Sequence, residues 1–166
     1  MNAIVYTSNT GFTAQYAKLL GGKLNLPVYS LDAAKKELAA GAEIIYLGWL
    51  MAGKVKGYKQ AAKLYKIAAV CGVGMGAGGS QMEEVRKGNA IPAEIPLFTL
   101  QGGFDLGKLH GLYKFMMNTM KRTVGKKLAA KLDKTADEQD MLDLLLHGGS
   151  RVSGENLRPI LEWCGK

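Results

Sequence analysis

The stretch Ile4-Val-Tyr-Thr-Ser-Asn-Thr-Gly-Phe-Thr-Ala-Gln-Tyr-Ala17 opens the chain with two predicted elements and a polar turn between them. Residues 3–6 are a short apolar run, which predicts a buried strand. Residues 7–11 are polar and end in glycine. Residues 11–22 place Tyr16, Leu19 and Leu20 on one face and end in two glycines, which predicts a helix. A strand followed by a polar turn and a helix is typical of an α/β domain.

The same alternation continues along the chain. Apolar runs predict four more strands, at residues 27–31, 43–48, 67–73 and 95–101. Helices are expected at residues 32–40, with Asp32 as N-cap, at 58–65 and at 80–87, and a loop at 49–57. Residues after the fifth strand are predicted to be helical at 106–126, 135–146 and 154–164. Residues 1–166 therefore predict a single domain, with a parallel sheet that has helices on both faces and binds ligands beyond the carboxyl ends of its strands.

Length and composition exclude several classes of protein. A chain of 166 residues that is 48% hydrophobic and 22% charged can bury a packed core. Its longest apolar run, residues 44–52, is shorter than the roughly 20 residues of a membrane span, and no signal peptide is visible. Two cysteines without ligand spacing and two histidines argue against a metal centre or a histidine-based triad. We therefore expect a cytoplasmic protein with reduced thiols.

The loop after the first strand carries the first candidate site. Ser8, Thr10 and Thr13 supply hydroxyls around the predicted start of a helix, where backbone amides and the helix dipole favour a dianion. The loop has no lysine and no P-loop pattern, which favours a phosphate monoester over a nucleoside triphosphate. The alternative is a polar N-cap turn without a ligand. The candidate residues of this loop are Ser8, Asn9, Thr10, Gly11, Phe12 and Thr13.

This opening stretch resembles the start of a flavodoxin. That family carries T/S-x-T-G-x-T after its first strand, and Ser8, Thr10, Gly11 and Thr13 match the motif. The resemblance implies a flavodoxin-like sheet of five parallel strands in the order 2-1-3-4-5. It also implies FMN as the cofactor, with its phosphate held by this loop.

The loop after the third strand is the second candidate site. A flavin ring needs flat apolar walls, which Trp49 and Met51 can supply. The segment Gly48-Trp-Leu-Met-Ala-Gly-Lys54 resembles the G-x-x-x-x-G-K segment of flavodoxin-like proteins, with Gly53 as a point where the backbone can turn as the flavin changes redox state. The alternative for Trp49 is simple core packing. The candidate residues are Trp49, Leu50, Met51, Ala52 and Gly53.

Glycines also follow the fourth and fifth strands. Gly74, Gly76 and Gly79 satisfy G-x-G-x-x-G, but the motif follows the fourth strand and lacks an acidic partner about 20 residues on. A close backbone approach to the flavin, or a flexible turn, is therefore favoured over a dinucleotide site. The candidate cofactor-binding residues of this loop are Gly74, Met75, Gly76, Ala77 and Gly78. Cys71 is expected to be a small buried residue. After the fifth strand, Gly102 and Gly103 favour a close passage of the chain, with Phe104 packed either on the crevice or on the sheet.

A basic, methionine-rich segment at about residues 106–134 completes the chain's unusual features. It holds eight basic residues and one acid, a net charge of +7, and residues 54–66 carry a further +5. The remaining residues sum to −4, which gives the total charge of +8. We expect one apolar face, which would either pack on the sheet or serve as a surface for a hydrophobic partner or an anionic membrane. The acids of residues 137–143 are expected to be solvated or to face lysines. The apolar face comprises Leu109, Leu112, Tyr113, Met116, Met120 and Val124.

The segment 97–121 resembles the flavodoxin-domain branch that includes the oxygen-independent protoporphyrinogen dehydrogenase. Two functions follow as expectations: an FMN-binding carrier of electrons between partner proteins or small redox molecules, or a protoporphyrinogen IX dehydrogenase-like enzyme that passes electrons to a quinone. A third possibility is a protein of this fold that has lost FMN and serves only in interaction. The expected partners are a redox protein or a quinone- or porphyrin-type molecule, with an anionic membrane at the inner face contacted peripherally through residues 106–127. Nucleic acid is not expected, because no recognition motif or stacking array accompanies the basic residues.

Overall fold

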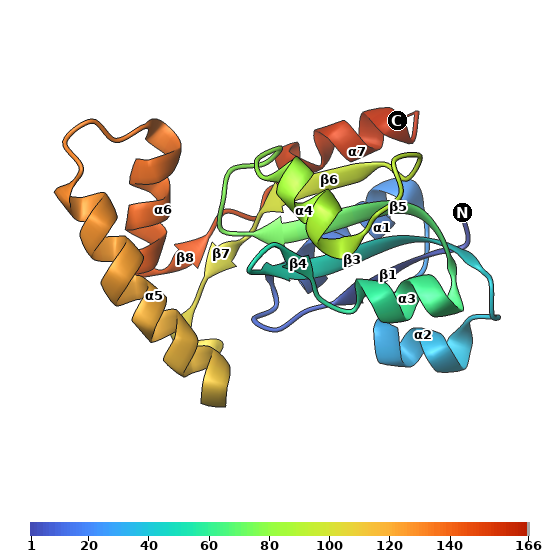
Figure 1. The fold of residues 1–166 in the computed structure, drawn as a ribbon. Helices are drawn as coiled ribbons and strands as arrows, with labels where there is room; N and C mark the ends of the chain where they lie inside the picture. Colours follow the sequence, from blue (N-terminus) through green and yellow to red (C-terminus); the bar gives the residue numbers. More distant parts are fainter. Residues whose placement is uncertain (166) are drawn as a thin grey trace.

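A computed structural model describes residues 1–165 and shows a central sheet with helices on both faces (Figure 1). Five parallel strands lie in the order β2-β1-β3-β5-β6. Numbered along the chain, this is the order 2-1-3-4-5, so the expected α/β architecture is confirmed. The strands are β1 (Ala3–Thr7), β2 (Val28–Ser30), β3 (Glu43–Met51), β5 (Lys66–Gly74) and β6 (Leu97–Gln101).

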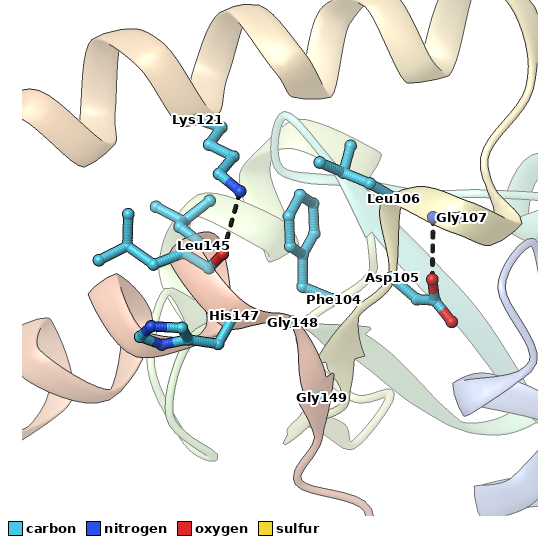
Figure 2. Close-up of a pocket in the computed structure, with 10 residues that line it drawn as sticks. Phe104, Asp105, Leu106, Gly107, Lys121, Leu145, His147, Gly148 and Gly149 are labelled. Atoms are coloured by element: carbon cyan, nitrogen blue, oxygen red, sulfur yellow. Dashed lines mark hydrogen bonds between the residues drawn. The ribbon is translucent and has the colours of Figure 1, made fainter.

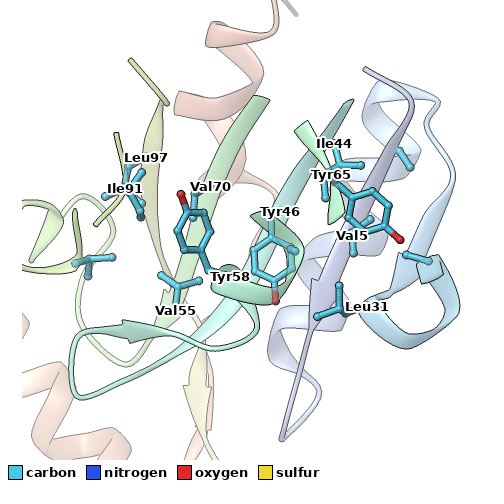
Figure 3. Packing of buried hydrophobic residues seen from close by; sticks show 14 residues of the cluster. Val5, Leu31, Ile44, Tyr46, Val55, Tyr58, Tyr65, Val70, Ile91 and Leu97 are labelled. Atoms are coloured by element: carbon cyan, nitrogen blue, oxygen red, sulfur yellow. The ribbon is translucent and has the colours of Figure 1, made fainter. Parts of the chain in front are cut away.

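Alternation along the strands builds a separate core on each face of the sheet. In β3, Ile44 and Tyr46 join one cluster, whereas Ile45 and Leu47 join the other. The first cluster, drawn in Figure 3, lies under α2 (Leu31–Glu37), α3 (Tyr58–Leu64) and α4 (Met82–Asn89). The second lies under α1 (Phe12–Leu24) and α7 (Arg158–Trp163). Burial on both faces explains why the strands are nearly continuous apolar runs.

Several predicted boundaries are wrong, each for a local reason. The expected loop at 49–57 is largely a hairpin: β3 runs to Met51 and pairs antiparallel with β4 (Lys54–Val55). The N-cap of α2 is Ser30 rather than Asp32, because the Ser30 hydroxyl accepts a hydrogen bond from the Ala33 amide at 3.2 Å. The last helix divides into a 3-10 turn, η2 (Glu155–Leu157), and α7, which has a proline in its first turn.

Residues 103–150 form an extension at one side of the sheet (Figure 1). Two short antiparallel strands, β7 (Gly103–Phe104) and β8 (Gly149–Ser150), connect it to the rest of the chain. Between them lie a 3-10 turn, η1 (Leu106–Lys108), and two packed helices, α5 (Gly111–Ala130) and α6 (Ala136–His147). The basic segment is therefore half of a helical hairpin, and its helix begins later than predicted.

The apolar side of α5 that is packed differs from the predicted one. Apart from Tyr113, which contacts Trp49 at the end of β3, the packed residues of α5 contact the α6 residues Leu144 and Leu145 and Phe104. Of the predicted apolar face, Met120 and Val124 belong to this cluster. The side of α5 that contacts α6 is rotated around the helix axis relative to the predicted face. The α5 residues in this cluster are Met117, Met120, Val124 and Leu128. Leu112 and Met116 are 70% and 40% exposed, and Leu109 is buried just before the helix begins.

Candidate functional site

The strand register brings the predicted loops to one edge of the sheet. Thr7 of β1 is paired with Gly48 of β3, and Trp49 is paired with Val73 of β5. The hydroxyl loop after Thr7, the end of β3 and the loop after β5 therefore leave three neighbouring strands at nearly the same level. This is the edge at which open α/β sheets bind ligands.

The first turn of α1 has the features of an anion site. Gly11 is its N-cap with φ of 95°, and no side chain caps the helix. A Cβ at Gly11 would meet no atom within 4 Å, so the loop is open to solvent at this point. The Ser8 hydroxyl accepts a hydrogen bond from the Gly11 amide at 3.2 Å, which leaves the hydroxyl proton available to a ligand. Thr13 is buried within the same turn, whereas Thr10 is partly exposed.

Phe12 and Asn9, the other two residues predicted in this loop, have different surroundings. Phe12 is 7% exposed and packs in the core under α1, so its side chain does not line the open part of the loop. Asn9 is exposed beside it. The ammonium of Lys108, from η1, lies 5.8 Å from the centre of the Phe12 ring. The sequence provided no sign of this cation, because 96 positions separate the two residues.

Trp49 provides a half-buried aromatic wall at the end of β3. Its ring packs edge-on against Tyr113 of α5, with centroids 5.4 Å apart and an angle of 82° between planes. The Lys56 ammonium lies 5.7 Å from the Trp49 ring and 5.9 Å from the Tyr113 ring. The Leu50 side chain lies on the opposite face of the sheet from Trp49. It packs against the first core cluster and covers Gly72 and Gly74, where an added Cβ would contact it. Trp49 is therefore the better placed of these two to face a ligand.

The β3–β4 turn is held by a residue that the sequence did not single out. Ala52 and Gly53 both have positive φ, 47° and 70°, as a two-residue hairpin turn requires. Asn89, at the end of α4 and 4% exposed, donates to the Gly53 carbonyl at 2.8 Å and accepts from the Val55 amide at 2.9 Å. The Gly53 carbonyl thus already has a partner. Asn89 lies 36 positions away, so no local pattern could have revealed this clamp.

Below the turn, Tyr46 joins β1, β3 and the segment that leads to α3. Its hydroxyl lies 2.7 Å from the Lys56 carbonyl oxygen, to which it donates, and 2.8 Å from the Thr7 hydroxyl. Burial raises the pKa of Tyr46 to about 12, so the ring stays neutral at physiological pH. A Cβ at Gly57, which has φ of 81°, would collide with this hydroxyl. The pair fixes the position of Lys56 next to Trp49.

The glycine-rich loop after β5 is ordered by its neighbours. Gly79 donates its amide to the Thr99 carbonyl at 3.1 Å, and the Thr99 hydroxyl donates to the Ser80 carbonyl at 2.8 Å. The following helix, α4, begins at Met82 and carries Glu83 and Glu84 in its first turn. Two carboxylates at the helix start disfavour a dinucleotide phosphate there. Met75, the bulkiest predicted residue of this loop, packs instead on the cluster between α5 and α6, while Gly76, Ala77 and Gly78 remain partly exposed or exposed.

Gly102 and Gly103 pass close to protein atoms. A Cβ at Gly102 would lie 2.8 Å from Val73, and one at Gly103 would lie 2.8 Å from the Phe12 ring. Phe104 packs on Leu144 and Leu145, so neither of the two predicted positions for its ring is correct. Cys71, as predicted, is a fully buried strand residue, and burial raises the pKa of its thiol far above the usual range.

A polar network fastens the extension to the sheet edge. Gln101 donates to Asp140 of α6 at 2.6 Å, and Arg151 bonds Asp140 and Asp143, each at 2.8 Å. Hydrogen bonds from His147 and Arg151 lower the pKa of Asp143. Asp140 and Asp143 of α6 therefore bind Arg151, and within residues 1–165 Lys131 is the only lysine paired with an acid of α6, Glu138, at 2.6 Å. This network attaches α6 to the end of β6.

Two hollows lie in the extension, away from the loops at the carboxyl edge of the sheet. One, of about 400 Å³, lies between the β7–β8 pair, η1 and the end of α6 (Figure 2). Lys121 reaches across it and donates to the Leu146 carbonyl at 3.0 Å. The other, of about 410 Å³, lies along α5 from Asn118 to Ala129. Neither is lined by the residues predicted to bind the cofactor.

Within residues 1–165, no helix combines the length and the apolar character needed to cross a membrane. The same part of the chain contains no group of three His, Cys, Asp or Glu side chains that could hold a metal ion. Comparison of the chain with protein-family models, with curated protein sequences and with solved structures gives no match.

Proposed function

We propose that this protein binds FMN at the carboxyl edge of its sheet and serves as a redox protein. The observation that carries the proposal is the register of β1 and β3, which sets Thr7, four residues before the N-cap of α1, opposite Gly48, the residue before Trp49. One side of this edge offers amides and hydroxyls for a phosphate, and the other offers an aromatic surface for a planar ring.

The residues present fit the two ends of FMN. The open Gly11 turn and the hydroxyls of Ser8, Thr10 and Thr13 would hold the phosphate. Trp49 would support the flavin ring, and Lys56 lies close enough to place a positive charge at the ring's edge. Bound FMN would supply one- and two-electron transfer, which explains why the edge needs no nucleophile or paired acids.

FMN titration of the purified protein, followed by flavin fluorescence, tests the proposal. We expect saturable quenching with one site per chain. Gly11→Ala places a side chain on a backbone with φ of 95° and should weaken FMN binding at least about tenfold, since a lost or misplaced charge-assisted bond is worth about 1.5–3 kcal/mol. Gly41→Ala is the matched control, because Gly41 also has positive φ and open space but lies far along the chain from the site. Equal affinity in the Gly11 and Gly41 variants would contradict the proposed phosphate position.

A turnover assay separates an electron carrier from an enzyme. A carrier should exchange electrons with a partner protein and should not turn over protoporphyrinogen IX with a menaquinone analogue. A dehydrogenase-like enzyme should consume three quinones for each protoporphyrinogen IX, because oxidation to protoporphyrin IX removes six electrons and each quinone accepts two. Sustained turnover that requires FMN would replace the carrier function with the enzymatic one.

A further inference from the structure

The N-terminal half of α5 exposes an apolar patch that consists of Leu112, Phe115 and Met116. Their exposed fractions are 70%, 69% and 40%. They lie on a different face of α5 from the contact line with α6, so folding of the extension leaves them in water. A contiguous group of large apolar side chains on a surface helix marks an interaction site more often than scattered single ones do.

Uncompensated positive charge borders this patch. Arg122 lies seven positions after Phe115, hence on the same side of α5, and Lys56 lies beside the patch through its contact with Tyr113. Within residues 1–165, neither of these two cations forms an ion pair with a carboxylate. The segments 106–134 and 54–66 carry +7 and +5. An apolar centre with a basic rim is complementary to an apolar spot ringed by carboxylates.

Three other occupants fit less well. A second copy of this chain would bring together two strongly basic surfaces, which repel. A membrane-surface helix keeps its apolar face along its length, whereas the outer face of α5 is apolar for two turns and then continues with Thr119 and Thr123. A single-stranded nucleic acid needs a series of stacking aromatics, and Tyr113 already packs on Trp49.

We propose that the apolar patch with its basic rim is the docking site for an acidic electron-carrier protein. The proposal extends the proposed function, because Tyr113 connects the patch directly to Trp49, at the edge where the flavin would lie. Charge would attract the partner and orient it, and burial of Leu112, Phe115 and Met116 would hold it there.

Calorimetric titration with a plant-type [2Fe–2S] ferredoxin, an acidic carrier, tests this surface at ionic strengths of about 0.01 M and about 0.1 M. We expect saturable binding that weakens at least about tenfold at the higher salt. Phe115→Ser and Arg122→Glu should each weaken binding about tenfold or more. Leu19→Ser and Lys18→Glu on α1 are the matched controls, because Leu19 is also exposed, at 41%, and Lys18 is an exposed lysine. The controls should bind as the wild type does.

The titrations are made both without FMN and after FMN has been added. Binding in the absence of FMN would support the docking site even if the flavin proposal failed. Absence of ferredoxin binding at low salt would overturn it, as would equal losses in the α1 controls. Binding to phosphatidylglycerol vesicles or to DNA but not to ferredoxin would also overturn it, and would assign the patch to a membrane or a nucleic acid instead.

Discussion

Replacement of Asn89 by alanine should destabilise the protein by removing the clamp on the β3–β4 turn. The change deletes the bonds to the Gly53 carbonyl and the Val55 amide, and Val55 is itself only 4% exposed. A buried polar group left without a partner costs about 1–3 kcal/mol, and the partly buried Gly53 carbonyl should lie at the low end, about 1 kcal/mol, so the two together should cost about 2–4 kcal/mol. That is a large part of a typical stability of about 5–15 kcal/mol.

Urea unfolding followed by circular dichroism measures this loss, and thermal unfolding should show a fall in Tm of roughly 4–16 °C. Asn118→Ala is the matched control: Asn118 is exposed on α5, and its loss should cost less than about 0.5 kcal/mol. Asn89→Asp keeps the acceptor for Val55 but loses the donor to Gly53. Its deficit should shrink as the pH is lowered, because a protonated carboxyl can donate again. An Asn89→Ala protein as stable as the control variant would refute this account of the turn.

Three further changes test other parts of the fold. Ala52→Gly should stabilise the protein by about 0.5–1 kcal/mol in urea unfolding, because alanine is strained at φ of 47°, and a loss of stability would contradict the hairpin geometry. Gly57→Ala should cost at least about 3 kcal/mol, since the new Cβ would collide with the Tyr46 hydroxyl, and a neutral effect would be inconsistent with that contact. Hydrogen bonds from Lys66 and the chain's amino group lower the pKa of Glu43 to about 2 from 4.5, so its stabilising effect is complete above about pH 4.5 and is lost as the pH falls towards 2. Glu43→Gln should therefore flatten the acid side of the stability profile over that range, and an unchanged profile would argue against the ion pair.

The sheet was predictable because its determinants are local. The parallel strands are buried on both faces, so they appear in the sequence as continuous apolar runs. The run from Ile44 to Leu47 predicts a strand without any knowledge of the helices that cover it. The same holds for the polar turn at Gly11, where a strand ends and a helix begins. Strand order was expected only through the family resemblance, since local patterns do not specify which strands are neighbours.

The contacts that position the candidate site could not be predicted in this way. Asn89 reads as an ordinary helix end, and its two bonds depend on a turn more than 30 positions earlier. The apolar residues of α5 show a helical period, but the period does not say that α6 selects the side with Met117. The packing of Tyr113 on Trp49 likewise depends on where the whole extension is attached.

The visible spectrum of the protein, mixed with an equal amount of FMN and freed of unbound flavin by gel filtration, tests the central claim most directly. We expect flavin absorbance to co-elute with the wild-type protein and with Gly41→Ala, and to be lost or sharply reduced in Gly11→Ala. Elution of all flavin with the small molecules in the wild type would contradict FMN binding at this edge of the sheet.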